Sequence, residues 1–148
     1  MMKSLHRQRG AETVEFAISA SLMFLILFGI IEFSVALYDK ATLTNASREG
    51  ARTGILFRPE PRDLAGEDAS IEAAIRDYAE EYLISLGGAA EMSIAIQRVD
   101  LGGGAGFDAG DEIVVTIDYP YQWLVLPGFI ASLGGALTLS STTVMRAE

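Results

Sequence analysis

The chain contains no cysteine and a single histidine, His6, among its 148 residues. Without cysteine it forms no disulfide framework, thiolate nucleophile or cysteine-ligated metal site, and one histidine is too few for a multi-histidine zinc site. Basic residues are scarce too, because eleven oppose twenty acidic ones, which disfavours nucleic acid as a partner. We therefore expect neither an enzymatic activity nor a bound cofactor.

Hydrophobic residues make up half of the chain and gather near its start. Residues 16–38 hold one charged side chain, Glu32, and a helix needs about 20 apolar residues to cross a bilayer. Lys3, Arg7 and Arg9 precede this run, and basic residues next to a span stay on the cytoplasmic side. The sequence predicts a single transmembrane helix with a cytoplasmic N-terminus and everything after it outside.

Two other interpretations of the apolar run stay open. It would suit the buried helix of a soluble protein, although the remaining chain is short for covering such a helix on all sides. It would also suit a cleavable secretory signal with Ser34-Val35-Ala36 as the cleavage site. Its apolar part is then longer than the usual about 7 to 15 residues, and Glu32 falls close to the cut.

Glu15 lies at the start of the apolar run, where a carboxylate in hydrocarbon costs about 3 kcal/mol and needs a partner. Cleavage after Gly10 would turn Ala11 into a charged amino terminus, four residues before Glu15 on the same helix face. In the uncut chain Arg7 or Arg9 would serve instead. Gly10, Ala11 and Glu15 are therefore candidate processing residues.

The same residues resemble a type IV prepilin processing site. The run RGAETVEF at 9–16 supplies a basic leader, a glycine before the cut and a glutamate at the fifth mature position. The segments GIIEF at 29–33, ASREGAR at 46–52 and VMRAE at 144–148 extend the likeness. Together they resemble the TadE-like family of pseudopilins, which belong to bacterial tight-adherence (Flp) pilus systems.

This resemblance implies a minor pseudopilin in the bacterial inner membrane. Its partners would be a prepilin peptidase, which cleaves after Gly10, and other pilin-like subunits with the pilus assembly machinery. Phe16 departs from the tyrosine that major Flp pilins usually carry after the glutamate. An adhesin-like binding module, anchored by the helix or secreted, is the alternative, and an uncut helix would favour it.

The chain is expected to divide into a basic leader at 1–10, a transmembrane and projecting helix at 11–57, and an extracytoplasmic head at 58–148. No proline interrupts the sequence between the apolar run and about Gly54, whereas the two prolines of 58–62 cannot continue a helix.

Arg48, Glu49 and Arg52 are the marked charges of the projecting part. The resemblance makes their segment a family hallmark and these side chains candidate docking residues. Charged helix faces are also commonly just solvated, so both interpretations stay open.

The head is expected to hold one amphipathic helix and one sheet. Apolar residues spaced by three and four predict a helix capped by Ser70, running to Leu86 and stopped by Gly87-Gly88. Alternating residues predict three strands, at 92–97, 113–119 and 137–144. The predicted fold is α+β: a long N-terminal transmembrane helix, then a small head with a three-stranded antiparallel sheet, the general plan of type IV pilins.

Two loops of the head carry secondary hypotheses. Residues 103–108 match the opening of a calcium-binding repeat, so Asp108, Asp111 and Glu112 are weak calcium candidates; a glycine-rich hairpin loop is the alternative. Residues 119–130 hold four aromatic side chains, which would contact a partner or a membrane interface, or complete a small core.

Overall fold

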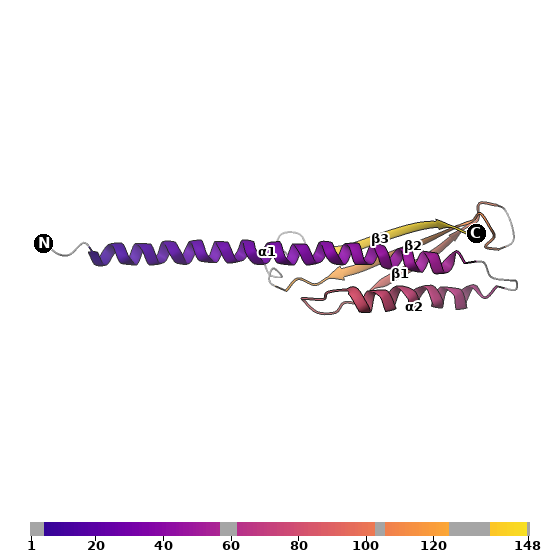
Figure 1. The fold of residues 1–148 in the computed structure, drawn as a ribbon, viewed down its shortest axis with the longest axis horizontal. Helices are drawn as coiled ribbons and strands as arrows, with labels where there is room; N and C mark the ends of the chain where they lie inside the picture. The colour runs from indigo at the N-terminus through magenta and orange to yellow at the C-terminus, as the bar shows by residue number, and fades with distance from the viewer. Residues whose placement is uncertain (1–4, 57–61, 103–105, 125–136, 148) are drawn as a thin grey trace.

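The computed structural model describes residues 5–56, 62–102, 106–124 and 137–147, and it confirms the predicted α+β fold. A 50-residue helix, α1, is followed by a second helix and three strands. Figure 1 shows α1 running most of the length of the molecule, with the other elements gathered on its C-terminal half. The elements are α1 (Leu5–Gly54), α2 (Leu64–Tyr82), β1 (Ser93–Val99), β2 (Glu112–Tyr121) and β3 (Leu137–Arg146).

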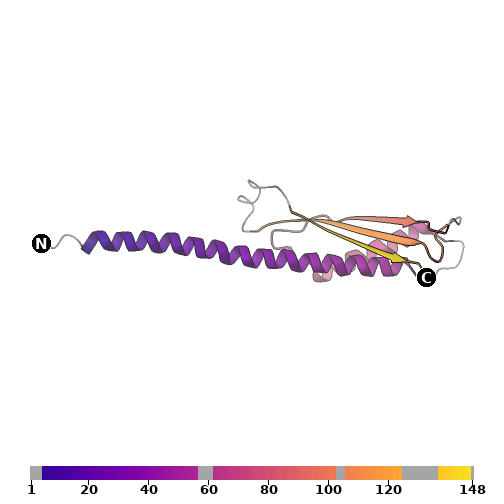
Figure 2. The ribbon, with the colours of Figure 1, turned by 90° about the horizontal axis from the view of Figure 1, so that it is seen from above.

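The strands form one antiparallel sheet in the order β1-β2-β3. Val115 of β2 pairs with Ile96 of β1 on one side and with Thr143 of β3 on the other. Every second residue of β2, from Ile113 to Tyr121, is buried, as the alternation of apolar residues predicts. Figure 2 shows both helices on one side of the sheet, so these side chains lie between the sheet and the helices.

The core lies where the C-terminal half of α1 meets α2 and the sheet. Leu43, Ile71, Ile75 and Ile117 are fully buried there. Gly50 permits the close approach of the two helices, because a Cβ atom at this position would lie 2.5 Å from Cγ1 of Ile75. The small residues of the projecting helix thus serve contact with the protein's own head.

The prediction for α2 was wrong at both ends. The helix starts at Leu64 because Asp63 caps it, accepting a hydrogen bond from the Gly66 N–H at 3.2 Å. Ser70 lies inside the helix and donates to the Gly66 carbonyl at 2.9 Å. The helix ends at Tyr82, before the glycine pair, because the next residues turn towards α1.

The other boundaries lie close to their predictions. The long helix ends at Gly54 as expected, although it already begins at Leu5, inside the predicted leader. Each strand extends two residues beyond its predicted C-terminal end, and β1 begins one residue later than expected. Strand pairing sets these ends, because a strand continues wherever its neighbour offers backbone partners.

Candidate functional site: the bare helix and the junction with the head

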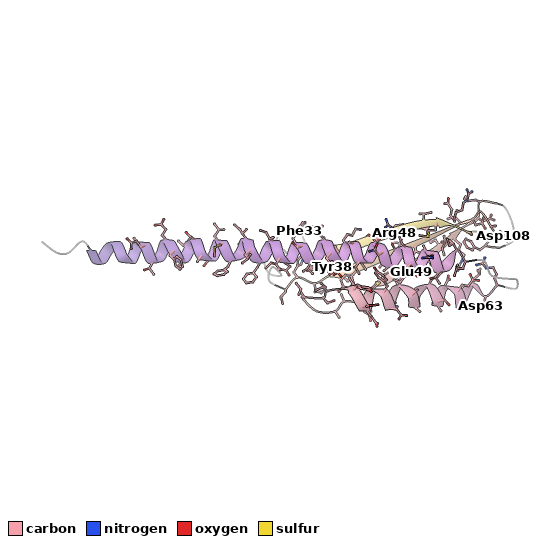
Figure 3. The ribbon with its side chains drawn as sticks, in the orientation of Figure 1. Phe33, Tyr38, Arg48, Glu49, Asp63 and Asp108 are labelled. Carbon is pink, nitrogen blue, oxygen red and sulfur yellow. The ribbon has the colours of Figure 1, made fainter. Side chains whose placement is uncertain are left out.

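The N-terminal half of α1 projects from the head as a bare apolar helix. Nearly all side chains from Ala11 to Ile31 are exposed, Phe16 to 73% and Ile30 to 61%. The most apolar window of this helix has a mean hydropathy of 2.3, and none of it is buried. Figure 3 shows its side chains pointing outward all round.

The length of the bare segment matches a membrane. Its 21 residues, 11–31, span about 31 Å at a helical rise of 1.5 Å, against about 30 Å for the hydrocarbon core of a bilayer. Among the residues that the structure describes, α1 is the one helix long and apolar enough to cross a membrane. It fits a membrane location, either as a span or as a signal anchor.

Glu32 ends the bare segment and belongs to the junction between α1 and the head. Its side chain is 2% exposed and accepts a hydrogen bond from the Leu124 N–H. The Tyr121 hydroxyl donates to the Glu32 carbonyl at 3.4 Å. The structure thus gives Glu32 partners in the head, and its place within the membrane stays a prediction.

Asp39 is a second buried carboxylate of this junction, two helical turns after Glu32 on the same face of α1. Its Oδ1 accepts a hydrogen bond from the Ile84 N–H at 3.0 Å, while Oδ2 has no partner among the described residues. Burial raises the pKa of Asp39, and the bond from Ile84 opposes this. The sequence interpretation missed Asp39, although its seven-residue spacing from Glu32 was a usable signal.

The two carboxylates tie both connections at the end of the head next to the bare segment to α1. Glu32 holds the segment after β2 and Asp39 holds the segment after α2. These segments also touch, because a Cβ atom on Gly87 would collide with the backbone of Gln122. Burial and the two carboxylates raise the pKa of Tyr121, which lies between them.

The candidate processing residues lie at the opposite end of the bare segment. Gly10, Ala11 and Glu15 are exposed and lie along one side of α1 with Val14 and Ile18. Ala11 and Glu15 therefore share a helix face, as their spacing predicts. A Cβ atom on Gly10 would meet nothing within 4 Å. Processing at this site stays a prediction.

The candidate docking residues Arg48, Glu49 and Arg52 are exposed on α1. Figure 3 labels Arg48 and Glu49, which lie where α1 runs alongside the head. The small residues of the same segment, Ser47, Gly50 and Ala51, are buried instead. Ser47 is buried, and its hydroxyl lies 2.7 Å from that of Thr143 in β3. The segment therefore combines a side that packs on the head with a charged side open to solvent, and a docking role of the charges stays a prediction.

Asp111 has a structural environment at the β1–β2 hairpin. Its carboxylate is 1% exposed and accepts backbone hydrogen bonds from Leu101 at 2.9 Å and Asp108 at 2.8 Å. The bond from Asp108, followed by that from Leu101, lowers the pKa of Asp111. Over the described ranges, no three His, Cys, Asp or Glu residues are grouped to hold a metal ion. A calcium role for Asp108, Asp111 and Glu112 stays a prediction, while 103–105 lie outside the described residues.

The first part of the aromatic segment completes the core. Tyr119 and Tyr121 are buried, and the Trp123 ring meets that of Tyr121 edge-on, with 5.2 Å between their centres. This favours the core interpretation for 119–123, whereas 125–130 lie outside the described residues.

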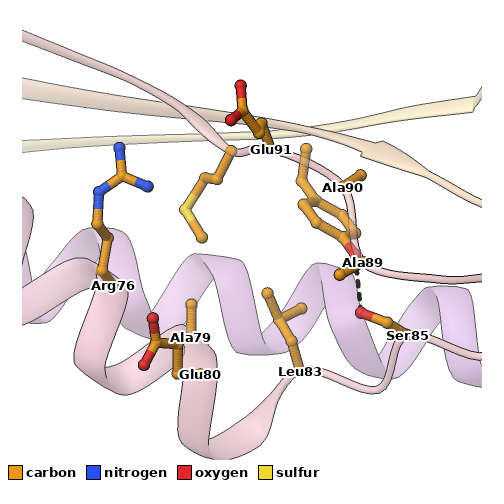
Figure 4. A pocket seen from close by; sticks show the side chains of 10 residues that line it. Arg76, Ala79, Glu80, Leu83, Ser85, Ala89, Ala90 and Glu91 are labelled. Carbon is orange, nitrogen blue, oxygen red and sulfur yellow. Dashed lines mark hydrogen bonds between the residues drawn. The ribbon is translucent and has the colours of Figure 1, made fainter.

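A hollow of about 340 Å³ lies between the end of α2 and the start of β1 (Figure 4). Its polar side chains are Arg76, Glu80, Ser85, Glu91 and Tyr119. The hydroxyls of Ser85 and Tyr119 lie 3.0 Å apart and hydrogen-bond each other across the hollow.

Comparison with known proteins finds a similarity in the N-terminal part of the chain. No curated protein matches the chain, and no solved structure does. The family model described as TadE-like protein matches residues 10–52, which cover the bare segment, the junction and the charged segment of α1. This family consists of pilus-associated structural proteins rather than enzymes. Residues 10–52 of the chain are therefore similar to the TadE-like family, whose proteins are associated with Tad pili.

Proposed function

We propose that this protein is a minor pseudopilin, a structural and assembly component of a bacterial Flp (tight-adherence) pilus or a related secretion system. Residues 11–31 hold it in the inner membrane, the leader at 1–10 is cytoplasmic, and the head at 58–148 is extracytoplasmic. One observation carries the proposal: a bare apolar helix of membrane length lies within the segment that matches the TadE-like family model.

The charge distribution supports this orientation. The three basic residues of the first ten lie at one end of the bare segment, and all twenty acidic residues lie after them. Basic residues next to a span stay in the cytoplasm, which leaves the acidic head on the other side.

The mechanism is physical rather than catalytic. A helix that is apolar on every side is stable in lipid and equally stable among other apolar helices, so the subunit can leave the membrane for a helical assembly. Glu12 and Glu15 are the two charges of the bare segment that oppose its burial in an apolar environment, and an amine at Ala11 of the same or a neighbouring chain neutralises Glu15. Cleavage after Gly10 creates that amine.

Processing requires the first turns of α1 to open, because the peptide bond after Gly10 lies within the helix. Glycine weakens a helix by about 1 kcal/mol relative to alanine, so its place before the cut favours local opening. A prepilin peptidase of the same membrane would then act on the cytoplasmic side.

The test is the mature N-terminus of protein purified from host membranes, measured by intact mass and terminal sequencing. Gly10→Leu is the test variant, and Gly29→Leu is its matched control, since a Cβ atom meets nothing within 4 Å at either glycine. We expect Ala11 as the first residue of the unmodified protein and of Gly29→Leu, and an uncut chain in Gly10→Leu.

Two results would refute the processing step. A mature chain beginning at Leu37 would mean a secreted head released by a signal peptidase. An uncut chain in the unmodified protein would leave a membrane-anchored binding module as the better description.

A further inference from the structure

The membrane-proximal end of the head carries exposed apolar side chains around the point where α1 emerges from its bare segment. Phe33 and Leu37 on α1, Leu86 after α2 and Leu124 after β2 are 56%, 56%, 37% and 55% exposed. We call these four residues the apolar collar. Figure 3 marks Phe33 at the place where α1 meets the head.

Hydrogen bonds fix the height of the collar along α1. Leu124 lies level with Glu32, because its N–H donates to the Glu32 carboxylate. The segment of Leu86 reaches the same level, because its neighbour Gly87 lies directly against the backbone of Gln122. The head therefore begins within about one helical turn of Ile31, where the bare segment ends.

This height coincides with the interfacial layer of a bilayer. A bilayer measures about 40 to 45 Å with its headgroups and about 30 Å without them, so each headgroup layer is about 5 to 8 Å thick. With residues 11–31 in the hydrocarbon, Phe33 lies about 3 Å above it and Leu37 about 9 Å above it along α1. The collar falls within this layer or at its edge.

We propose that the apolar collar is a lipid-contact surface that seats the head in the headgroup layer of the outer leaflet. Continuity with the bare segment identifies lipid as the occupant, because the collar begins two residues after it along the same helix. Tyr38, which is 46% exposed, follows Leu37 on α1, and tyrosine side chains favour this layer. The charged side chains Glu80 and Glu81 lie farther from the bare segment than the collar does. They belong to α2, and the hydrogen bond between Ile84 and Asp39 holds the end of this helix about 12 Å above Ile31 along α1.

Seating on lipid gives the junction a physical role. The carboxylates of Glu32 and Asp39 hold the two connecting segments against α1, so the collar moves with the helix as one unit. Transfer of the subunit out of the membrane then removes both the bare segment and the collar from lipid. This inference rests on the membrane insertion in the proposed function, and its test separates the two.

The absence of cysteine allows single-cysteine labelling of the full chain without background. Nitroxide labels are placed at Leu86→Cys and Leu124→Cys in vesicles of phosphatidylethanolamine with a minority of phosphatidylglycerol. Val144→Cys is the matched control, 53% exposed on β3 near the far end of the head, and Phe24→Cys lies within the bare segment. Relaxation by oxygen, which enters lipid, is compared with relaxation by a water-soluble nickel chelate.

We expect the ratio of oxygen to nickel relaxation to be severalfold higher at Leu86→Cys and Leu124→Cys than at Val144→Cys, and highest at Phe24→Cys. Bromines placed near the headgroups of the lipid should also quench the native fluorescence of Trp123 more than bromines near the bilayer centre. This second measurement needs no substitution and so avoids any folding defect.

Three results would overturn the inference. If Leu86→Cys and Leu124→Cys resemble Val144→Cys while Phe24→Cys is lipid-like, the helix spans but the head stands clear of the membrane. If both collar labels are shielded from both reagents until the protein is diluted in lipid, another copy covers the collar. If Phe24→Cys is water-exposed, membrane insertion fails, and the proposed function fails with it.

Discussion

Replacing Gly50 with alanine tests whether the contact between α1 and α2 depends on a missing side chain. The added Cβ atom would lie 2.5 Å from Cγ1 and 2.6 Å from Cδ1 of Ile75, far inside van der Waals distance. Ile75 is fully buried, so it has no open space to move into. The new methyl group must therefore displace α2 or force Ile75 into an unfavourable rotamer.

Two opposing terms set the magnitude. Overpacking of a filled core costs about 1 to 3 kcal/mol, whereas glycine to alanine within a helix gains about 1 kcal/mol. Gly50→Ala should therefore lower the free energy of unfolding by up to about 2 kcal/mol. In an Ile75→Ala background the clashing atoms are gone, and the same substitution should raise it by about 1 kcal/mol.

The assay is urea unfolding of the full chain in detergent micelles, followed by the fluorescence of Trp123, the single tryptophan. Ile75→Ala alone should cost about 2 to 5 kcal/mol, since it leaves a cavity in the core. Gly29→Ala is the control, because a Cβ atom there meets nothing within 4 Å and the residue lies in the bare segment.

The change of sign between the two backgrounds is the critical result. If Gly50→Ala stabilises both backgrounds equally, with a coupling energy below about 0.5 kcal/mol, the helices tolerate a side chain at this position. The reasoning about the close approach would then be refuted.

Three further predictions concern the buried carboxylates, each measured by the same unfolding assay. Glu32→Ala leaves the Leu124 N–H without its acceptor and should lower the free energy of unfolding by about 1.5 to 3 kcal/mol. The control Glu49→Ala, at an exposed position, should change it by less than about 0.5 kcal/mol. Equal effects of the two substitutions would contradict a stabilising role of Glu32 at the junction. Burial raises the pKa of Asp39 in the folded state, so its contribution to stability is fully present below the pKa of the unfolded state and is lost as pH rises through the folded pKa. Asp39→Asn should abolish that loss and be at least as stable as the unmodified protein at pH 7, and a clear destabilisation there would contradict the assignment. Hydrogen bonds lower the pKa of Asp111, so its contribution is present above the unfolded pKa and is lost as pH falls through the folded one. Asp111→Asn should remove that acid-side dependence and reduce stability at pH 7, and an unchanged pH profile would argue against these bonds.

Local patterns predicted most of the elements of the fold. The long apolar run predicted α1, the alternation of apolar and polar residues predicted the three strands, and apolar residues spaced by three and four predicted α2. These elements can be predicted because each depends on residues close together in sequence. The period at which their apolar residues recur matches the geometry of a helix or a strand. The resemblance of the N-terminal part of the chain to the TadE-like family could be recognised for the same reason, since one of its motifs is a contiguous run around Gly10 and Glu15.

The ends of α2 and the hairpin show where local patterns stop. Ser70 and Asp63 are both acceptable caps in sequence, and the structure chooses Asp63. The acidic residues near the glycine-rich loop suggest a metal site, and this local pattern does not reveal that Asp111 accepts hydrogen bonds from the backbone of its own hairpin. Each outcome depends on which of several available partners comes within reach.

The sequence by itself determined that the chain has a long apolar helix, a basic start, an acidic remainder, no cysteine and a single histidine. Tertiary structure alone decided where the bare segment ends. Hydropathy reports only how apolar the residues of α1 are, whereas the end of the bare segment depends on the head, which covers one face of α1 from Glu32 onward. It also decided the partners of Glu32 and Asp39, which come from segments 45 to 92 residues away along the chain. No local pattern specifies such contacts, since they exist only once the sheet and α2 have packed against α1.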